Sequence, residues 1–349
     1  MTSTVPPLTA INRLLIVKTS SLGDIIHALP VAQALKNARP ELVLGWVVRR
    51  RCAGILQGCP FIDHLHIVPD KPTLRELGAV RRALRAPQYE AALDMQGLLL
   101  SGLLTWLSAA PVRIGWDRNR EGNARFLTHP VVPGGDITRH EIDALYGFAE
   151  ALGVYPVRGT YPPQAYLAAE GRAQAEAWLA RLPHPRVALN VGASRAYKTW
   201  PTSRWAALAD GLAQDGVSLV FVGGDTDAAA VNTVQTQMTM REAPSVNLAG
   251  KTTLRELASV LAACDSVVSA DTGPMHLAVA VGTPVVALFG GTDLRRHGPY
   301  GARHISLHKP QPGGVPSRRP TDAYGAACMA ALAPADVRDA VHRLLYAHA

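Results

Sequence analysis

The stretch SADTGPMHLAVAVGTPVVALF, residues 269–289, decides the fold class of this chain. A short β-rich run at 266–269 ends in the loop 271–274, a helix-like segment runs through His276, and a second apolar strand follows at 284–289. A strand–loop–helix–strand unit of this kind is typical of an open parallel sheet, in which ligands bind at the carboxyl ends of the strands. The loop offers a carboxylate, a hydroxyl and backbone N–H groups at a helix start, which is chemistry for a phosphate and its sugar.

A second candidate loop lies in RLLIVKTSSLGDIIHALP, residues 13–30. The apolar run 14–17 predicts a buried strand, and an amphipathic helix begins near Asp24. Between them lie small polar residues suited to an anion or sugar, namely Thr19, Ser20, Ser21 and Gly23. Asp24 is either a plain helix cap or a functional carboxylate, and its position alone leaves both open. The spacing matches neither the Walker loop nor the GxGxxG dinucleotide fingerprint.

Four segments in chain order then carry a family resemblance: KTSSLGDIIHALP at 18–30, DMQGLLLS at 94–101, ASRAYKTWP at 193–201 and SADTGPMHLAVAVGTPVVALFG at 269–290. Together they resemble the ADP-heptose:lipopolysaccharide heptosyltransferases of glycosyltransferase family 9, most closely the heptosyltransferase I branch. The resemblance covers nearly the whole chain. It implies an α/β protein of the GT-B fold, with two Rossmann-like domains whose parallel sheets face a central cleft, and no obligatory metal.

The alternation of strands and helices along the chain agrees with a parallel sheet in each half. The predicted strands are 14–17, 42–48, 66–67, 91–94, 186–190, 218–222, 246–248, 266–269 and 284–289. A proline-rich stretch at 156–163 breaks the periodicity and indicates a domain boundary. By the resemblance we expect an acceptor-binding Rossmann-like domain at 1–160, a nucleotide-sugar-binding one at 161–330, and a closing helix at 331–349 that packs back on the N-terminal domain.

The composition is that of a globular protein with a basic balance. The 349 residues are 48% hydrophobic and 18% charged, with a formal net charge of +8. A basic chain suits an anionic partner, such as a phosphorylated lipid, a membrane surface or a nucleic acid. No zinc-finger spacing or aromatic–basic RNA motif is present, so nucleic acid is the weaker choice. With the resemblance, we expect an anionic glycolipid acceptor at the inner membrane surface.

No segment predicts a bound metal or a membrane span. The four cysteines form no CxxC pair. Cys328-Met329 resembles the tail of a longer cysteine cluster of some family members, but the other cysteines of that cluster are missing, so we predict no metal and no cofactor. The uncharged stretch 95–112 is interrupted by polar residues and glycines and favours a strand end, loop and buried helix. The N-terminus lacks a signal-peptide pattern. We expect a cytoplasmic enzyme, peripheral to the inner membrane.

Sugar transfer from a nucleotide diphosphate needs a base for the acceptor hydroxyl and positive charge for the leaving diphosphate. The resemblance puts the base on Asp24 and the charge on Lys198. The alternative for Lys198 is a solvated surface lysine. A protein that only binds nucleotides needs neither group, so their joint presence favours catalysis.

The resemblance also implies a set of donor-binding residues: Ser194, Asp227, Thr252, Asp271, Thr272, Gly273 and His276. Asp271 would meet the donor sugar hydroxyls, while Thr272 and Gly273 would hold the diphosphate. His276 would contact the heptose. A lone histidine is more often an ordinary helix residue, but the family motif favours the contact here. Asp227 would reach the ribose, with ordinary turn chemistry as the alternative.

On the acceptor side the resemblance implies contacts from six residues: Ser20, Ser21, Gly23, Gln96, Arg120 and His140. Arg120 would pair with a carboxylate or phosphate through its planar guanidinium, with a solvated charged loop as the alternative. Leu100 stands where heptosyltransferase I tends to carry a lysine, and the segment 71–85 is shorter than its counterpart there. Both departures leave the acceptor open.

The sequence therefore predicts an inverting glycosyltransferase that moves heptose from ADP-heptose to the lipopolysaccharide inner core, either Kdo-lipid A or a core heptose. The alternatives are a heptosyltransferase acting on a protein or another glycan, a nucleotide-sugar epimerase, and a non-catalytic nucleotide-binding protein.

Overall fold

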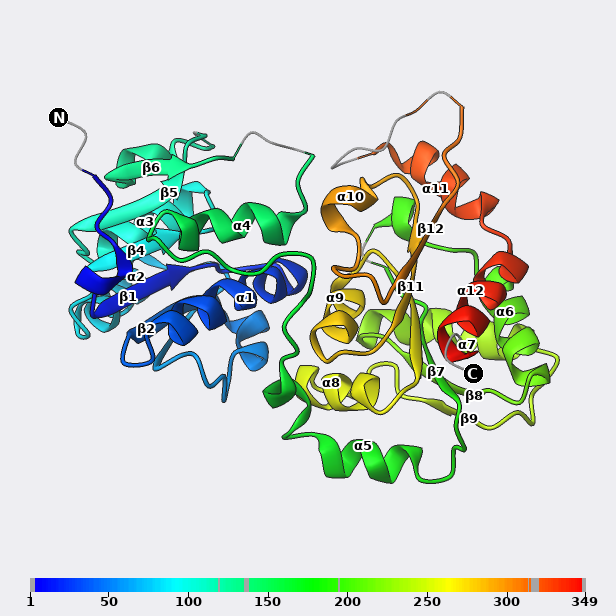
Figure 1. Ribbon diagram of the computed structural model, residues 1–349. Coiled ribbons are helices and arrows are strands. Elements are labelled where there is room, and N and C mark those ends of the chain that lie inside the picture. The colour runs from blue at the N-terminus through cyan, green and yellow to red at the C-terminus, as the bar shows by residue number, and fades with distance from the viewer. Residues whose placement is uncertain are drawn as a thin grey trace. The chain divides into compact units, whose positions relative to one another are not determined.

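The computed structural model describes residues 4–118, 120–134, 138–193, 195–312, 314 and 320–346. The chain divides into two units, residues 1–158 and 159–349. Each unit contains one six-stranded sheet, and every strand pair in both sheets is parallel. Figure 1 shows the helices that cover the sheets. This confirms the predicted α/β class with two Rossmann-like units.

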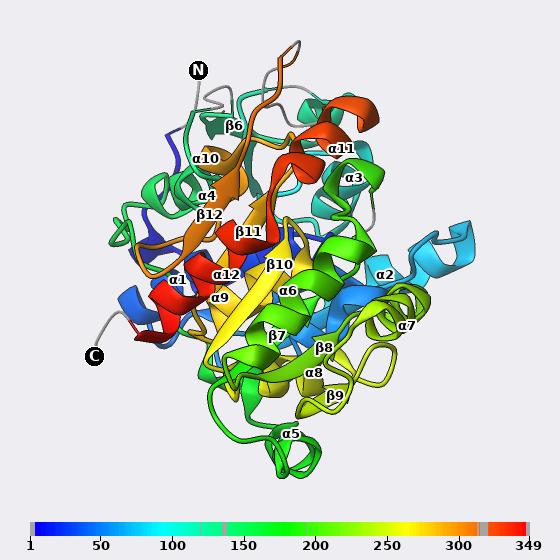
Figure 2. The same cartoon turned by 90° about the vertical axis from the view of Figure 1, so that its right-hand side faces the viewer.

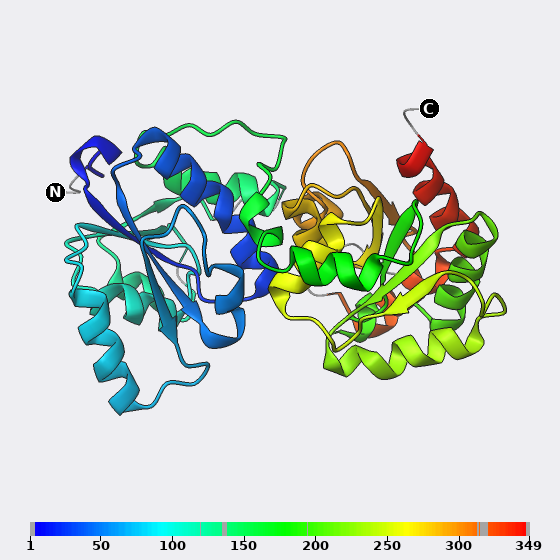
Figure 3. The same cartoon turned by 90° about the horizontal axis from the view of Figure 1, so that it is seen from below.

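The first unit has the strand order β3-β2-β1-β4-β5-β6. Its strands are β1 (Arg13–Val17), β2 (Val43–Arg49), β3 (His64–Val68), β4 (Ala91–Asp94), β5 (Val112–Trp116) and β6 (His129–Val132). Its α-helices are α1 (Leu22–Ala38), α2 (Leu74–Arg85), α3 (Leu99–Leu107) and α4 (Glu141–Glu150), and short 3-10 turns span Leu8–Ala10, Arg50–Ile55 and Asn123–Phe126. Helices α1 and α4 pack together on one face of the sheet, and α2 and α3 on the other (Figure 3).

The second unit has the strand order β12-β11-β10-β7-β8-β9. Its strands are β7 (Arg186–Asn190), β8 (Ser218–Val222), β9 (Ser245–Asn247), β10 (Ser266–Ala270), β11 (Val285–Phe289) and β12 (Ile305–His308). Its α-helices are α5 (Arg172–Leu179), α6 (Thr202–Gln214), α7 (Ala228–Gln237), α8 (Leu254–Ala262), α9 (Gly273–Ala280), α10 (Leu294–His297), α11 (Asp322–Ala331) and α12 (Pro334–Tyr346); 3-10 turns span Ala165–Ala168, Ala196–Lys198 and Asp225–Asp227. Helices α6, α7 and α12 lie on one face of the sheet and α8 and α9 on the other (Figures 1 and 2).

Local sequence sets where several of these helices begin. The tetrapeptide TLRE occurs at 73–76 and again at 253–256. In both places the threonine side chain accepts the N–H of the glutamate, and the glutamate carboxylate accepts the threonine N–H, at 2.8 Å for Thr73 and 2.7 Å for Thr253. This reciprocal capping satisfies N–H groups that the first helical turn leaves unbonded, so α2 and α8 begin there.

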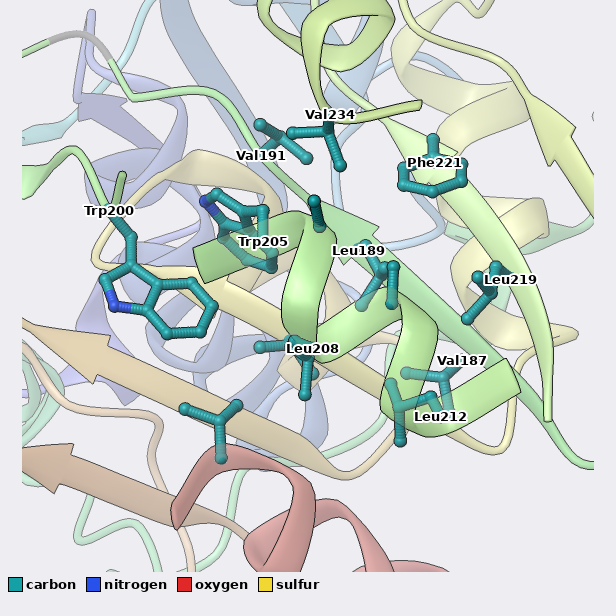
Figure 4. Close-up of a cluster of buried hydrophobic side chains, with 14 of the residues drawn as sticks. Val187, Leu189, Val191, Trp200, Trp205, Leu208, Leu212, Leu219, Phe221 and Val234 are labelled. Atoms are coloured by element: carbon teal, nitrogen blue, oxygen red, sulfur yellow. The ribbon is translucent and has the colours of Figure 1, made fainter. Parts of the chain in front are cut away.

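The core of the second unit lies between its sheet and α6. Leu189 of β7 and Phe221 of β8 face Trp205 and Leu208 of α6 (Figure 4), and all four side chains are almost fully buried. Continuous burial explains why these strands are nearly unbroken apolar runs. Truncating Leu208 to alanine would cost about 2–5 kcal/mol of stability, the usual range for a buried leucine. The sheet is thus a rigid support for the loops at its edge.

Both sheets change winding direction at a central strand pair. The pair is β1 and β4 in the first unit, with Val17 opposite Asp94, and β7 and β10 in the second, with Asn190 opposite Ser269. In open α/β sheets the carboxyl ends of the strands at this switch point form the ligand-binding crevice. The two loops singled out in the sequence follow β1 and β10, so each lies at a switch point.

The closing helix predicted at 331–349 is α12. In the second unit it packs against α6, β10 and β11. The Asp215 carboxylate, just after α6, accepts from Nε of Arg338 at 2.6 Å and lies 2.7 Å from Nε2 of His342. The packing of α12 on the N-terminal domain remains a prediction. The predicted domain boundary at 160/161 also remains a prediction; the two units of the structure divide at 158/159.

Candidate active site

A cluster of charged side chains marks the switch point of the second unit. Asp271 follows β10, and Lys198 ends the short turn after β7. The Lys198 ammonium lies 2.7 Å from Oδ2 of Asp271 and donates to the main-chain oxygen of Asp271 at 2.9 Å. His276, in the first turns of α9, places Nε2 3.8 Å from Oδ1 of the same carboxylate. The structure therefore brings together three residues predicted from separate parts of the sequence.

The Asp271 carboxylate is held ionised in a buried position. The residue is 6% exposed. Burial is the largest single influence and raises its pKa, but the bonding from His276 and the charge of Lys198 together outweigh it and hold the pKa below its ordinary value. Lys198 is more open, with 18% of its side chain exposed. A buried carboxylate whose pKa is strongly shifted by specific charged neighbours is a candidate functional-site residue.

Polar side chains tie the two central strands of this unit together. Nδ2 of Asn190 donates to Oγ of Ser269 at 2.9 Å and to Oγ1 of Thr272 at 3.0 Å. Thr272 is the N-cap residue of α9, but its side chain makes no capping bond to the helix. Instead, Asn190 fixes the Thr272 hydroxyl beside the helix start, next to the Gly273 backbone. Asn190 was missed in the sequence, although an asparagine at the end of a buried strand is a usable signal.

The other predicted donor residues lie on neighbouring loops. The Asp227 carboxylate accepts the N–H of Gly224 at 2.8 Å, and a Cβ placed on Gly192 would lie 2.0 Å from its Cγ. Asp227 thus has the turn role considered as the alternative, and its ribose contact stays a prediction. Thr252 is half-buried just before α8. Ser194 lies outside the described residues.

In the first unit, Asp24 has a capping role. Its Oδ2 accepts from the N–H of Ser21 at 2.8 Å and from the Ser21 hydroxyl at 2.7 Å, at the start of α1. The carboxylate is 38% exposed, and Nζ of Lys18 lies 3.9 Å from Oδ1. The hydrogen bonds of Asp24 are therefore those of a helix-capping residue. A cap that remains open to solvent still has access to a substrate hydroxyl, so the two roles are compatible.

Gln96 joins the two loops at this switch point. Its Oε1 accepts the N–H of Thr19 at 3.1 Å and of Ser20 at 3.3 Å. Beside it, the buried Lys18 donates to the Met95 carbonyl at 3.3 Å. Ser20, Ser21 and Gln96 are thus placed together as predicted, with Gly23 in the first turn of α1. The role of Lys18 was missed, although a charged residue directly after a buried strand is unusual.

A buried carboxylate connects this site to the Arg120 turn. Asp94 is fully buried and accepts from the N–H groups of Gln96 at 3.1 Å and Gly97 at 2.9 Å, and from Nδ2 of Asn123 at 3.3 Å. Burial raises the pKa of Asp94, with these hydrogen bonds opposing it. Oδ1 of Asn123 in turn accepts the N–H of Arg120 at 3.4 Å. The backbone at Arg120 is therefore anchored to the switch point through two residues that the sequence did not single out for a role.

His140 is the N-cap residue of α4, which packs against α1. Its Nδ1 accepts the N–H of Ile142 at 3.1 Å, and its ring packs edge-on against His27, with 5.6 Å between centroids. Its role toward an acceptor stays a prediction. Among the described residues no group of three or more histidine, cysteine, aspartate or glutamate side chains is placed to hold a metal ion. All four cysteines are buried free thiols.

Two parallel-sheet units with polar loops at both switch points are typical of the GT-B class of glycosyltransferases. The sequence model of glycosyltransferase family 9 (heptosyltransferase) matches residues 77–326, and the chain belongs to this family. This confirms the predicted family and the prediction of a glycosyltransferase.

Individual relatives agree. The chain is 31% identical to lipopolysaccharide heptosyltransferase 1 of Pseudomonas aeruginosa, over 84% of this chain and 83% of the relative. Among solved structures, it matches a family 9 glycosyltransferase from Veillonella parvula with a TM-score of 0.81 and 24% identity, covering 96% and 97% of the two chains. It also matches the Escherichia coli heptosyltransferase WaaC with ADP-2-deoxy-2-fluoro heptose, with a TM-score of 0.72 and 25% identity over 95% and 99%.

Proposed function

We propose that this protein transfers heptose from ADP-heptose to the lipopolysaccharide inner core, either Kdo-lipid A or a core heptose, with inversion at the anomeric carbon. The observation that carries the proposal is the cluster of Lys198, Asp271 and His276 at the switch point of the second unit. The printed names of the relatives, lipopolysaccharide heptosyltransferases, and the ADP-heptose analogue with WaaC support the choice of substrates.

The second unit, on this proposal, binds the donor. Lys198 stabilises the negative charge that develops on the departing ADP, as a preorganised cation would. The start of α9 offers the Thr272 hydroxyl and the Gly273 N–H to the diphosphate, because helix N-termini favour phosphate groups. Asp271 and His276 meet the heptose. Contacts from Ser194, Thr252 and Asp227 to the donor complete the proposed set.

The first unit binds the acceptor and supplies the base. The acceptor hydroxyl attacks the anomeric carbon, the bond from that carbon to the ADP oxygen breaks, and Asp24 takes the hydroxyl proton. A single displacement of this kind inverts the anomeric configuration. Ser20, Ser21, Gly23, Gln96 and His140 line the acceptor path in this proposal, and Arg120 pairs with an acceptor carboxylate or phosphate.

We propose that no metal is obligatory, because Lys198 and the start of α9 supply positive charge for the leaving group. Full activity in an excess of EDTA would support this. Loss of activity that added Mg²⁺ restores would contradict it.

The acceptor is a lipid, so we also propose peripheral association with an anionic membrane surface. No helix in the described part of the chain is long and apolar enough to cross a bilayer. Helix α2 instead exposes Arg75, Arg81, Arg82 and Arg85 together with Leu74, which is 89% exposed. Basic side chains next to an exposed leucine suit an anionic interface. Co-sedimentation with vesicles containing phosphatidylglycerol, weakened by salt, would support this; equal binding to neutral vesicles would not.

The functional proposal is tested by ADP release from ADP-heptose with and without Kdo-lipid A. Acceptor-dependent release is the expected result. Release without any acceptor would indicate an epimerase-like or hydrolytic reaction. Donor binding without release, with Kdo-lipid A and also with Kdo-lipid A that carries a core heptose, would indicate a nucleotide-binding protein. ADP release that requires a protein or a different glycan would agree with the proposed donor but contradict the proposed acceptor.

A further inference from the structure

The backbone at Tyr197 lies against two glycines from distant parts of the second unit. Gly290 follows β11, and Gly325 lies inside α11. A Cβ on Gly290 would lie 2.2 Å from the Tyr197 carbonyl oxygen. A Cβ on Gly325 would lie 2.7 Å from that oxygen and 2.4 Å from the Tyr197 Cβ. Distances this short do not occur, so any side chain at either position would force the turn 196–198 to move.

Glycine is required at positions 290 and 325 because there is no room for a side chain, and not because of the backbone conformation. Neither Gly290 nor Gly325 has a positive φ angle. Glycine in the interior of a helix is unfavourable relative to alanine, because it adds conformational freedom to the unfolded chain. If the space beside Gly325 were open, alanine would strengthen α11. The approach of the Tyr197 backbone is therefore the physical reason for a glycine at 325.

The segment that follows the turn 196–198 is bound to the C-terminal end of α11. The Leu332 carbonyl, just after α11, accepts from Nε1 of Trp200 at 3.2 Å and from Nη1 of Arg204 at 2.7 Å. Trp200 is 1% exposed, so this anchor is rigid. The segment 196–204 is thus fixed on both sides of Lys198, at Tyr197 by Gly325 and at Trp200 by Leu332.

We propose that Gly325 is a positioning residue for Lys198. Because Gly325 has no side chain, the Tyr197 backbone packs directly against α11. This contact fixes the position of the turn 196–198, from which the Lys198 ammonium reaches Asp271 at 2.7 Å. Gly325 touches no substrate, and its effect passes through the lysine. This inference rests on the proposed function, in which Lys198 stabilises the departing ADP.

The test is a double-mutant cycle of Gly325→Ala with Lys198→Met, with kcat as the readout. Gly325→Ala alone should lower kcat about 10–100-fold, the scale expected when a catalytic group is displaced by roughly 1 Å. In the Lys198→Met background the same change should have almost no further effect, because residues that act through one group are non-additive. Ala326→Gly is the matched control. Ala326 is exposed on the same helix, so this substitution weakens α11 without adding volume against Tyr197.

Each outcome is informative. Independent, multiplying losses, or no loss in Gly325→Ala, would overturn the positioning role alone. Full activity of Lys198→Met would remove the lysine from the proposed function and the positioning role with it. If Gly325→Ala does not fold, as judged by circular dichroism, Arg204→Met replaces it, because it removes a bond to Leu332 without adding volume. The same non-additivity with Lys198→Met is then expected, and multiplying losses would overturn the proposal.

Discussion

Lys198 reaches from the loop after β7 to Asp271 after β10, and these are the two strands at which the second sheet changes direction. The ion pair therefore lies at the switch point, where open α/β sheets bind their ligands. The carboxylate is almost fully buried and the ammonium is more exposed, so on the proposed function a donor diphosphate would meet the cation first. This relationship links the fold to the proposed chemistry.

Replacing Lys198 should affect turnover more than donor binding. Lys198→Met should lower kcat about 10²–10³-fold, by analogy with the loss of one preorganised donor to a developing anion. The dissociation constant for ADP-heptose, measured by calorimetry, should change much less. Lys309→Met is the control, because Lys309 is an exposed lysine of the same unit that pairs with Asp336. Equal losses in binding and turnover would reduce Lys198 to a binding residue.

A conservative change separates the capping role of Asp24 from its proposed role as the base. Asp24 is the N3 residue of a capping box whose N-cap is Ser21, and an amide can replace a carboxylate at N3. Asp24→Asn keeps an oxygen that accepts from Ser21, so the melting temperature should hardly change. The amide is not a base, so kcat should fall about 10²–10⁴-fold. Glu76→Gln is the matched control, because Glu76 makes the same capping box at Thr73 in α2. Near-normal turnover in Asp24→Asn would exclude Asp24 as the base.

Arg120 should act on the acceptor alone. Arg120→Gln should raise the KM for the acceptor, because the planar guanidinium pairs with carboxylate or phosphate in a way that glutamine does not reproduce. The KM for ADP-heptose should stay the same. Arg172→Gln, on the exposed face of α5, serves as the control. A larger change in the donor constant would mean that the substrates are assigned to the wrong units.

The contact between α6 and α12 should be sensitive to acid. The Arg338 bond is the largest cause that lowers the pKa of Asp215, and His342 adds to it. A lowered folded-state pKa contributes stability above the ordinary carboxyl pKa of about 4 and loses it as the pH falls through the folded value. Asp215→Asn should therefore destabilise the second unit at pH 7 by about 1 kcal/mol, since the partners are partly exposed.

Thermal unfolding at pH 7 and at pH 3 checks this. The difference in melting temperature between wild type and Asp215→Asn should shrink at the lower pH. Asp339→Asn, an exposed aspartate of α12, should show little difference at either pH. A gap that widened in acid would contradict the assigned direction of the pKa shift.

The sequence predicted the central strands of both sheets because they are buried on both faces and read as apolar runs. It did not predict β5, β6 or β12. Strand β5 contains an arginine and a glycine, β6 is a short edge strand with a proline, and β12 is a short, half-exposed edge strand. Such strands lack both a continuous apolar run and a regular alternation, so periodicity gives no signal.

The site was predicted in part for a similar reason. Lys198, Asp271 and His276 lie in the motifs that carry the family resemblance. The resemblance alone therefore predicted that they belong to one site. Asn190 and Asn123 act through bonds across neighbouring strands and loops. Those partners are set by strand register and loop packing, which a single sequence does not contain.

The most direct test of the central claim is to identify the product formed from ADP-heptose and Kdo-lipid A. Mass spectrometry should show one heptose added to the acceptor, and NMR should show an anomeric configuration opposite to that of the donor. Both signals should fall in Asp24→Asn and Lys198→Met. The account is contradicted if the product retains the donor configuration, or if neither Kdo-lipid A nor Kdo-lipid A that already carries a core heptose is modified.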